Sequence, residues 1–277
     1  MPNEVLVVIG TGGMGIAAAR RIGAGKTVLL ADFNEAALNA VAEVLIEEGQ
    51  QVQTQVVDVS SRDSVRALAR AAADLGPVRQ VLHTAGLSPA QAPTAAILNV
   101  DLLGVALVLD EFAEVIAPGG AGVIISSMSG HLIPPMDREV DAQLALTPTD
   151  ELLNLPSTSR DAFSSAGYAY SFAKRANQLR VRAASTTWGA KGARINSISP
   201  GVISTKMGQQ ELASPSGAGM RAMVEGSGTG RLGSADDIAA AAAFLLSDAA
   251  SFITGTDLLV DGGAVAAVLT GKVNLRG

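Results

Sequence analysis

The sequence predicts an α/β fold, with one doubly wound parallel sheet of about seven strands and helices on both faces. Three observations predict it. Short apolar runs alternate with longer helical patterns, which is typical of a parallel sheet covered on both sides. The 277 residues, of which 48% are hydrophobic, suffice for one large domain with a buried core. No repeat or linker divides the chain, so we expect a single domain over residues 1–277.

The strands and helices can be assigned in chain order. Strands are expected at seven apolar runs: Val5–Ile9, Thr27–Ala31, Val52–Val57, Val78–His83, Val123–Ser127, Arg194–Ile198 and Asp257–Val260. The helical patterns between and after the first four strands cover Gly13–Ile22, Glu35–Glu48, Ser64–Leu75 and residues 95–116.

Composition excludes several functional classes. The net charge of −6 argues against a nucleic-acid surface, and the absence of Cys excludes disulfides and thiolate ligands. Two histidines, His83 and His131, are too few for a typical His-based metal site, and we interpret His83 as structural. No apolar run reaches membrane-spanning length, and no signal peptide precedes the first strand. We therefore expect a cytoplasmic protein without metal, membrane or nucleic-acid partners.

A glycine-rich turn follows the first strand and opens a helix. It reads Gly10-Thr-Gly12-Gly13-Met14-Gly15, which is G-x-G-x-x-G in the strand–turn–helix context that this motif requires. Glycines permit the tight turn and let backbone N–H groups approach a pyrophosphate at the helix N-terminus. The turn predicts dinucleotide binding on a Rossmann fold.

An acidic residue, Asp32, ends the second strand. Its carboxylate can accept hydrogen bonds from the adenosine ribose and would repel a 2′-phosphate. Phe33, rather than a basic residue, comes next, so the sequence favours NAD over NADP. Asp58 and Val59 follow the third strand, where they can flank the adenine ring or simply form a helix-capping turn.

Tyr170 and Lys174 are four residues apart in a helical pattern, so they lie on one helix face. An unperturbed tyrosine has a pKa of about 10, and a fixed neighbouring cation lowers it. A tyrosine tuned in this way can exchange a proton with a substrate oxygen. Alone, this spacing is more often a solvated pair on a helix, and its partners elsewhere in the chain strengthen the catalytic interpretation.

The chain resembles the short-chain dehydrogenase/reductase family over nearly its full length. The stretches that carry the resemblance are Thr84–Gly86, Asn99–Gly104, Ile125–Gly130, Tyr170–Lys174, Arg194–Thr205, Gly230–Gly233, Phe244–Asp248 and Ile253–Gly263. The resemblance implies that Tyr170 is the acid/base and that Lys174 lowers its pKa and holds the nicotinamide ribose. It also implies that Ser127 orients the substrate and that Asn99 helps to hold a proton-relay water near the lysine.

The same resemblance implies contacts to the nicotinamide. Pro200 and Gly201, with Val202, match the turn that contacts its amide, and Thr205 matches a hydroxyl near the carboxamide or the pyrophosphate. The complete expected cofactor set is Gly10, Gly12, Gly13, Met14, Gly15, Asp32, Phe33, Asp58, Val59, Ala85, Gly86, Tyr170, Lys174, Pro200, Gly201, Val202 and Thr205.

Three features depart from the family pattern. The glycine loop is about one residue shorter than usual. Tyr168 lies six residues before Lys174, whereas the enoyl-reductase branch spaces its tyrosines seven apart, so C=C reduction is disfavoured and Tyr168 is interpreted as a packing residue. Between Ser127 and Tyr170 stand 42 residues, where the family usually leaves about a dozen.

The extra residues form an insertion, 131–167, which holds four of the eleven prolines and six acidic residues. We expect a polar surface excursion with one helix. It resembles the corresponding stretch of bacterial 3α-hydroxysteroid dehydrogenase/carbonyl reductase, which suggests steroid or bulky ketone substrates. Equally, it can remodel the interface of a homodimer or homotetramer. Residues 206–230, rich in Gly, Ser and Met, are expected to form a mobile substrate loop.

The sequence therefore predicts an NAD-dependent oxidoreductase that interconverts a secondary alcohol and a ketone by hydride transfer. A non-catalytic nucleotide-sensing module on the same fold is one alternative, but it would not need the proton-transfer residues. An epimerase or dehydratase of the extended branch is another. It is disfavoured because such enzymes carry a larger C-terminal substrate domain, and little follows Asp261–Gly263 here.

Overall fold

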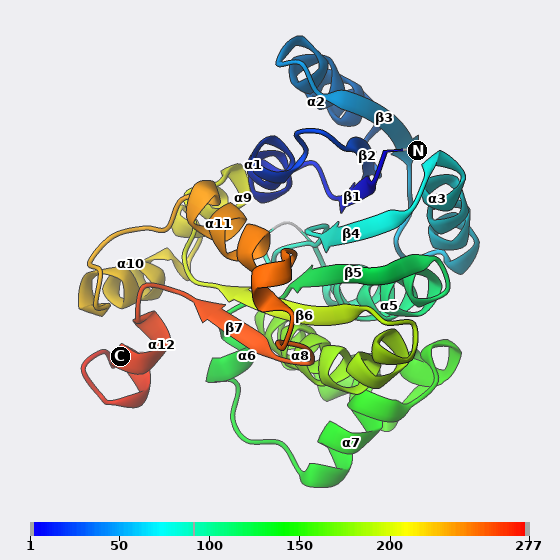
Figure 1. The fold of residues 1–277 in the computed structure, drawn as a ribbon. Helices are drawn as coiled ribbons and strands as arrows, with labels where there is room; N and C mark the ends of the chain where they lie inside the picture. The colour runs from blue at the N-terminus through cyan, green and yellow to red at the C-terminus, as the bar shows by residue number, and fades with distance from the viewer. Residues whose placement is uncertain (1–2, 91, 275–277) are drawn as a thin grey trace.

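The computed structural model describes residues 3–90 and 92–274, and its centre is a parallel sheet of seven strands. The strand order is β3-β2-β1-β4-β5-β6-β7, and every neighbouring pair is parallel (Figure 1). The strands are β1 (Val5–Ile9), β2 (Thr27–Asp32), β3 (Gln51–Val56), β4 (Val78–His83), β5 (Ile116–Ile125), β6 (Arg194–Pro200) and β7 (Asp257–Val260). This confirms the predicted doubly wound α/β fold.

Helices cover both faces of the sheet (Figure 1). One face carries α3 (Arg62–Leu75), α5 (Gly104–Ala113) and α8 (Ala166–Ala190). The other carries α1 (Gly13–Ile22), α2 (Glu35–Glu47) and α11 (Ala235–Leu245). The remaining helical elements are α4 (Thr94–Ile97), η1 (Leu98–Leu103), α6 (Ser129–Leu132), α7 (Arg138–Leu146), η2 (Thr149–Asn154), η3 (Pro156–Thr158), η4 (Arg160–Ala162), α9 (Lys206–Leu212), α10 (Gly217–Gly226), η5 (Asp248–Ala250) and α12 (Ala264–Leu269).

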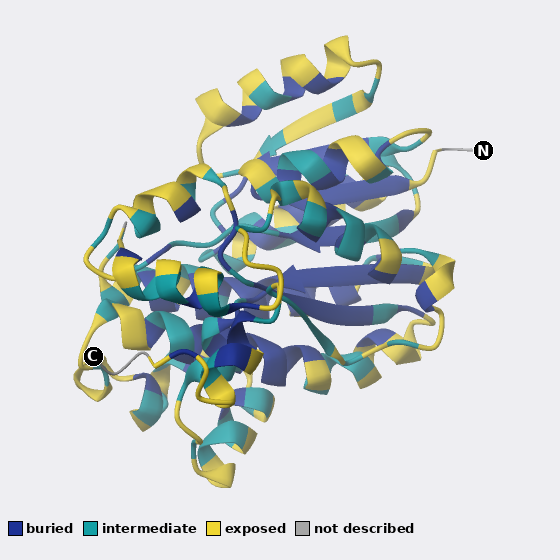
Figure 2. Cartoon of the chain, turned by 90° about the vertical axis from the view of Figure 1, so that its left-hand side faces the viewer, coloured by how far each residue is buried: buried dark blue, intermediate teal, exposed yellow. Residues whose placement is uncertain are grey.

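The central strands are apolar because both of their faces are buried. In β1 the side chains of Val5, Val7 and Ile9 pack toward α3 and α5, whereas Leu6 and Val8 pack toward α1 and α2. This alternation follows from the two-residue period of a strand. Figure 2 shows the buried residues concentrated in the central strands, and exposed residues on the outer surfaces of the helices.

Two predicted elements differ from the structure by more than one or two residues at their ends. β5 begins at Ile116, seven residues before the predicted start, because Ile116 pairs with Val78 before the ladder shifts register. The predicted helix over 95–116 is instead three consecutive elements, α4, η1 and α5. The middle one, η1, is a π-helical segment, a rare form that occurs frequently at functional sites.

The insertion lies at the surface and packs on the rest of the domain through an apolar side. Its one longer helix, α7, lies on the outer side of α8, away from the sheet (Figure 1). Leu144 and Leu152 are buried in a cluster with Leu98 and Leu102 of η1 and Phe172 of α8. The insertion is therefore less polar than its composition suggests, because the leucines between the acidic residues bury an apolar stripe.

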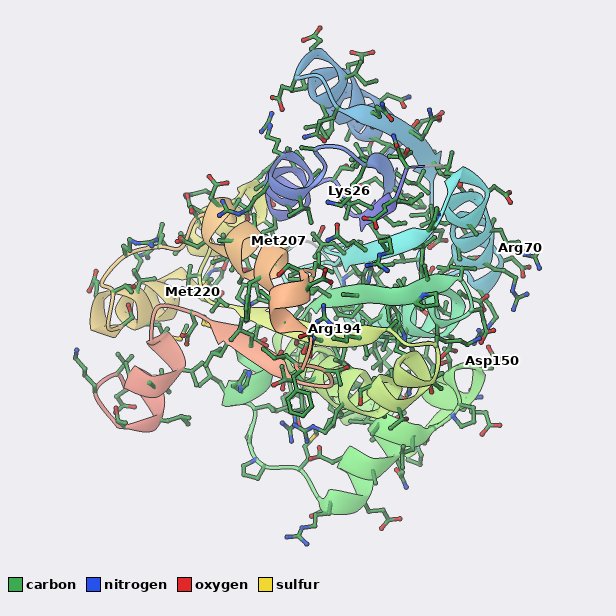
Figure 3. All side chains as sticks on the ribbon, viewed as in Figure 1. Lys26, Arg70, Asp150, Arg194, Met207 and Met220 are labelled. Carbon is green, nitrogen blue, oxygen red and sulfur yellow. The ribbon has the colours of Figure 1, made fainter. Side chains whose placement is uncertain are left out.

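Polar contacts also fix the insertion in place. Arg180 of α8 donates to the carbonyl oxygens of Leu144 and Thr147 and to Thr149 Oγ1, at 3.0–3.1 Å. Asp150, labelled in Figure 3, accepts a hydrogen bond of 3.0 Å from Arg62 of α3. The insertion is thereby joined both to the long helix and to a helix that covers the sheet.

The predicted substrate loop, 206–230, is also partly helical. It contains α9 and α10, which carry Met207 and Met220 respectively (Figure 3). Among residues 3–90 and 92–274, none of the helices combines the length and the apolar character that a bilayer crossing requires. Over the same ranges no group of His, Asp and Glu side chains is arranged to hold a metal ion.

Candidate active site

A cavity of about 510 Å³ lies at the carboxyl edge of the sheet, where the strand order reverses between β1 and β4. In open α/β sheets this switch point is where ligands bind. The cavity, here called the glycine-turn cavity, is lined by the turns after β1 to β4, by the α4–η1 helix and by α9. Its lining residues are Gly10, Gly12, Asp32, Phe33, Val57, Asp58, Val59, Ser60, Thr84, Ala85, Gly86, Leu87, Ala96, Asn99, Val100 and Met207.

The glycine turn brings the uncapped start of α1 close to the end of β1. Gly10 adopts φ +98°, and a Cβ there would lie 2.5 Å from the Ala85 nitrogen. A Cβ on Gly15 would lie 2.0 Å from the Gly10 oxygen, so only glycine allows α1 to start this close to the turn. Gly12, the N-cap of α1, makes no side-chain cap and faces open space. Backbone donors at an uncapped helix start fit the diphosphate of a dinucleotide.

Asp32 lines the same cavity and is held rigidly. Its Oδ2 accepts hydrogen bonds from Thr11 N at 2.7 Å and Thr11 Oγ1 at 2.8 Å, and its Oδ1 accepts from Asn34 N at 3.0 Å. Each carboxylate oxygen has capacity for further hydrogen bonds. Asp58 Oδ1 accepts hydrogen bonds from Ser60 N and Ser60 Oγ, which fits a helix-capping turn. Asp58 also lines the cavity, which fits a position beside the adenine ring.

The loop after β4 is tied to the glycine turn. Thr84 N and Ala85 N donate to Ile9 O at 2.7 and 2.9 Å, and Thr84 Oγ1 donates to Gly10 O at 2.8 Å. The sequence interpretation did not single out Thr84 as the residue that joins these two turns. Gly86 follows in the same loop and lies against the side chains of Asp101 and Lys174.

The predicted catalytic side chains converge. The Lys174 Nζ atom lies 5.3 Å from the centre of the Tyr170 ring and donates to Ile125 O at 3.4 Å. The Ser127 hydroxyl, from the turn after β5, hydrogen-bonds the Tyr170 phenol. Ser127 Oγ also accepts from Ser129 N at 3.2 Å. We call Ser127, Tyr170 and Lys174 the catalytic cluster.

Asn99, expected to help hold a proton-relay water near the lysine, makes its side-chain hydrogen bond within its own helical segment. Asn99 is exposed, lines the glycine-turn cavity, and donates through Nδ2 to Ala95 O at 2.9 Å. Asp101 occupies the place beside the lysine, with its Oδ1 3.0 Å from Lys174 Nζ. Both Asp101 oxygens also accept from Leu87 N, at 3.3 and 3.0 Å.

A signal for Asp101 was present in the sequence. Asp101 lies three residues after Leu98 and four before Val105, two apolar positions of the buried helix face. A carboxylate on a buried face requires a cation or hydrogen-bond donors. Lys174 is the cation that the described structure brings to it.

The charges around Tyr170 oppose one another. Burial raises the pKa of Tyr170, Lys174 opposes that rise, and Asp101 and Glu211 add to it, while the Ser127 hydrogen bond lowers it. Lys174 lowers the pKa of Tyr170 as expected, but the net direction of the shift is upward. The physical reason is that burial disfavours the phenolate and that Asp101 offsets the charge of the lysine.

The lysine itself stays protonated. Burial alone would lower the pKa of Lys174, but Asp101 and Tyr170 raise it above the ordinary value. Burial raises the pKa of Asp101, and this rise is opposed by Lys174 and by the hydrogen bond from Leu87.

Two further groups face this site. Glu211 of α9 hydrogen-bonds Ser88, and burial raises the pKa of its carboxyl while Ser88 and Lys174 oppose the rise. His83, the last residue of β4, is fully buried, and neither ring nitrogen has a hydrogen-bond partner among the described residues. Burial, with a contribution from Lys174, lowers the pKa of His83 to about 3, so the ring is neutral. The sequence interpretation missed Glu211, because an isolated acidic residue in a polar segment carries no pattern.

The turn after β6 joins the two halves of the site. Pro200 O accepts from Met128 N at 2.9 Å, beside the Ser127 turn. Gly201 packs against Asp261, where a Cβ would lie 2.7 Å from the Asp261 Cα atom. Thr205 caps α9 and lies against Gly13 of the glycine turn. Val202, between them, is buried. The segment from Pro200 to Thr205 therefore contacts the Ser127 turn at one end and the start of α1 at the other.

A glycine turn at the start of α1, beside a Ser–Tyr–Lys cluster at the carboxyl edge of a parallel sheet, defines a class of nicotinamide-dependent oxidoreductases. Residues 3–136 match the family model described as short chain dehydrogenase, and residues 138–265 match that described as Enoyl-(Acyl carrier protein) reductase. The chain belongs to the short-chain dehydrogenase/reductase family, whose members use NAD or NADP.

Individual relatives match over nearly the whole chain. Short-chain dehydrogenase/reductase bsc3 of Alternaria brassicicola is 41% identical over 96% of this chain and 97% of its own. 3beta-hydroxysteroid dehydrogenase 2 of Eggerthella lenta is 30% identical over 94% of each chain. The crystal structure of levodione reductase superposes with a TM-score of 0.76 and 26% identity, covering 96% of this chain and 99% of the other.

Proposed function

We propose that this oxidoreductase is NAD-dependent and interconverts a secondary alcohol and a ketone. The observation that carries the proposal is the convergence of the Tyr170 phenol, the Ser127 hydroxyl and the Lys174 ammonium beside the glycine-turn cavity. The nicotinamide supplies the hydride acceptor or donor when it is bound.

Each member of the cluster has one task. Ser127 donates a hydrogen bond to the substrate oxygen and holds it near the phenol. Tyr170 gives a proton to that oxygen when a ketone is reduced, and takes one when an alcohol is oxidised. Lys174 supplies a fixed positive charge behind the phenol. Preplaced donors and charges of this kind are usually the largest contribution to catalysis.

The preference for NAD is supported by the charge of the glycine-turn cavity. Asp32 and Asp58 line it, and its described lining includes no Lys or Arg. A ribose with free hydroxyls can donate to the fixed Asp32 carboxylate, whereas a 2′-phosphate would meet negative charge without a cation to pair with.

The substrate class we favour is a bulky, ring-containing ketone or alcohol. A hydroxysteroid dehydrogenase and levodione reductase are among the relatives, and the insertion resembles that of the 3α-hydroxysteroid dehydrogenase branch. Reduction of a C=C bond is disfavoured because Tyr168 is 37% exposed and packs on Phe163, with 6.0 Å between ring centres. We further propose that the protein is cytoplasmic and forms a homodimer or homotetramer. Light scattering of the purified protein would test the oligomeric state.

The test is a panel of secondary alcohols and ketones, including hydroxysteroids, assayed with NAD(H) and NADP(H) by nicotinamide absorbance. We expect turnover of at least one cyclic substrate and a strong preference for NAD(H). Comparable efficiency with NADP(H) would refute the cofactor assignment. Tight NAD binding without turnover of any substrate would favour a nucleotide-sensing module instead.

A further inference from the structure

The ion pair between Lys174 and Asp101 is the most deeply buried one of the site. The lysine side chain is 5% exposed and the aspartate side chain is 0% exposed, with 3.0 Å between Nζ and Oδ1. Burying two charges is costly unless they are paired and their remaining hydrogen-bonding groups are satisfied. Here Leu87 N donates to the aspartate, and Ile125 O accepts from the lysine. The pair is therefore a built feature of the site.

The backbone around this pair is shaped to admit it. A Cβ on Gly86 would lie 2.6 Å from Asp101 Oδ1 and 3.4 Å from Lys174 Nζ, so the glycine leaves the space in which the two groups meet. Asp101 itself lies within the π-helical segment η1. Three separate elements, the loop after β4, η1 and α8, thus meet at one carboxylate.

The charged groups that face Tyr170 and Lys174 come from several elements. Asp101 on η1 and Glu211 on α9 are the carboxyl groups, and His83 on β4 is neutral. The single positive charge of Lys174 is therefore matched by Asp101 at contact distance. A lysine compensated in this way does much less to favour a phenolate than an unpaired lysine would.

We propose that Asp101 is a positioning residue that fixes the Lys174 ammonium and offsets its charge, so that Tyr170 remains a proton donor at neutral pH. If Tyr170 is the acid/base of the proposed function, on which this consequence rests, the site is set for ketone reduction, in which the phenol gives its proton to the substrate oxygen. The reverse reaction then requires a more alkaline medium.

The electrostatic effect can be separated from the structural one by Asp101→Asn. The asparagine has the same shape, and its Oδ1 can still accept from Leu87 N, but its side chain carries no charge. With the compensating charge removed, Lys174 acts fully on the phenol. We expect the pKa of Tyr170 to fall by on the order of one pH unit, at the low end of the range for a nearby charge.

The chain offers a direct measurement of this shift, because it contains only two tyrosines. In a Tyr168→Phe background, Tyr170 is the only source of tyrosinate absorbance. Titrating the cofactor-free protein with and without Asp101→Asn therefore reports the ionisation of Tyr170 itself. Circular dichroism at each pH shows whether the protein is still folded. This readout requires neither substrate nor cofactor.

Glu111→Gln in the same background is the matched control. Glu111 is a mostly buried carboxylate that pairs with Arg62 and Arg66 of α3, and it is not among the groups that influence Tyr170. We expect its variant to titrate like the parent. Asp101→Glu, which restores the charge, should move the titration back toward the parent.

Superimposable tyrosinate titrations of the folded Asp101→Asn variant and its parent would overturn the proposal, leaving Asp101 a structural anchor only. If Asp101→Asn does not fold, Asp101→Ser removes the charge with a smaller side chain beside Gly86. A lower pKa of Tyr170 in that variant would support the proposal, and an unchanged titration would overturn it. Failure of the proposed function would be seen separately, as full turnover by Tyr170→Phe, and would leave the titration result intact.

Discussion

The glycine-turn cavity and the catalytic cluster lie at the same edge of the sheet but are built differently. The cavity is shaped mainly by backbone, with Gly10 and Gly15 permitting a turn that no larger residue could form. The cluster is assembled from side chains, with Ser127, Tyr170 and Lys174 brought together from two distant segments. A site built by backbone can be recognised from glycine spacing, whereas a site built by side chains depends on which helix faces meet.

The largest effect should come from the catalytic cluster. We expect Tyr170→Phe to fold and bind NAD normally but to lose about 10²–10⁴-fold in turnover, because a general acid/base contributes this much. Tyr168→Phe is the matched control and should lose far less, since its ring packs on Phe163. Single-turnover kinetics and NAD titration of both variants check this. A larger loss in Tyr168→Phe would mean that the catalytic tyrosine is misassigned.

His83 should make the catalytic side sensitive to acid. Its pKa is about 3 in the folded protein, against an ordinary histidine value of 6.5, so between these values the unfolded chain binds a proton that the folded chain does not. The contribution of His83 to stability is therefore complete above pH 6.5 and is lost as the pH falls toward 3. The full loss is on the order of 5 kcal/mol.

The measurement for His83 is urea unfolding between pH 7 and pH 4, compared with His83→Asn. We expect the stability of the parent to fall more steeply with decreasing pH than that of the variant. Parallel pH dependences would show that His83 is protonated, or solvated, in the folded protein.

The insertion should matter to α8 and not to the glycine-turn cavity. Leu144 is fully buried against α8, so Leu144→Ala should lower the free energy of unfolding by about 2–5 kcal/mol. NAD affinity of the folded protein should be unchanged. Leu146→Ala on the same helix is the control, because Leu146 is 72% exposed. Equal small effects for both variants would contradict the packing of the insertion on α8.

The smallest of these effects belongs to the glycine-turn cavity. Asp32→Ala should weaken NAD binding by roughly 1–3 kcal/mol, the scale of lost hydrogen bonds to a charged group. Binding of NADP should weaken less or improve, because the negative charge is removed. Calorimetric titration with both nucleotides checks this, and an equal loss for NAD and NADP would argue against a contact between Asp32 and the ribose.

The difference between a cavity built by backbone and a cluster built by side chains also explains what the sequence could predict. The strands, the glycine turn and the position of Asp32 depend on local pattern, and the structure confirms the sheet that they imply. Tyr170 and Lys174 were accessible because four-residue spacing on a helix is also a local rule.

The misses involve pairings between distant elements. Asn99 and Asp101 are two residues apart, and only the packing of η1 on α8 decides which of them meets Lys174. Residue composition made the insertion look polar, but the spacing of Leu144 and Leu152 buries an apolar stripe that composition does not reveal. The start of β5 was missed because Ile116 is joined to the ladder across a register shift.

Gly86 has a consequence for how this sequence can change over evolutionary time. Because a Cβ there would collide with the Asp101 carboxylate, the tolerance of position 86 depends on the residue at position 101. A smaller residue at position 101 opens the space that an alanine at position 86 needs. While aspartate stays at position 101, an alanine at position 86 would collide with its carboxylate. The two positions are therefore epistatic, and a laboratory lineage that drifts away from aspartate at 101 gains access to substitutions at 86 that are closed to the present chain.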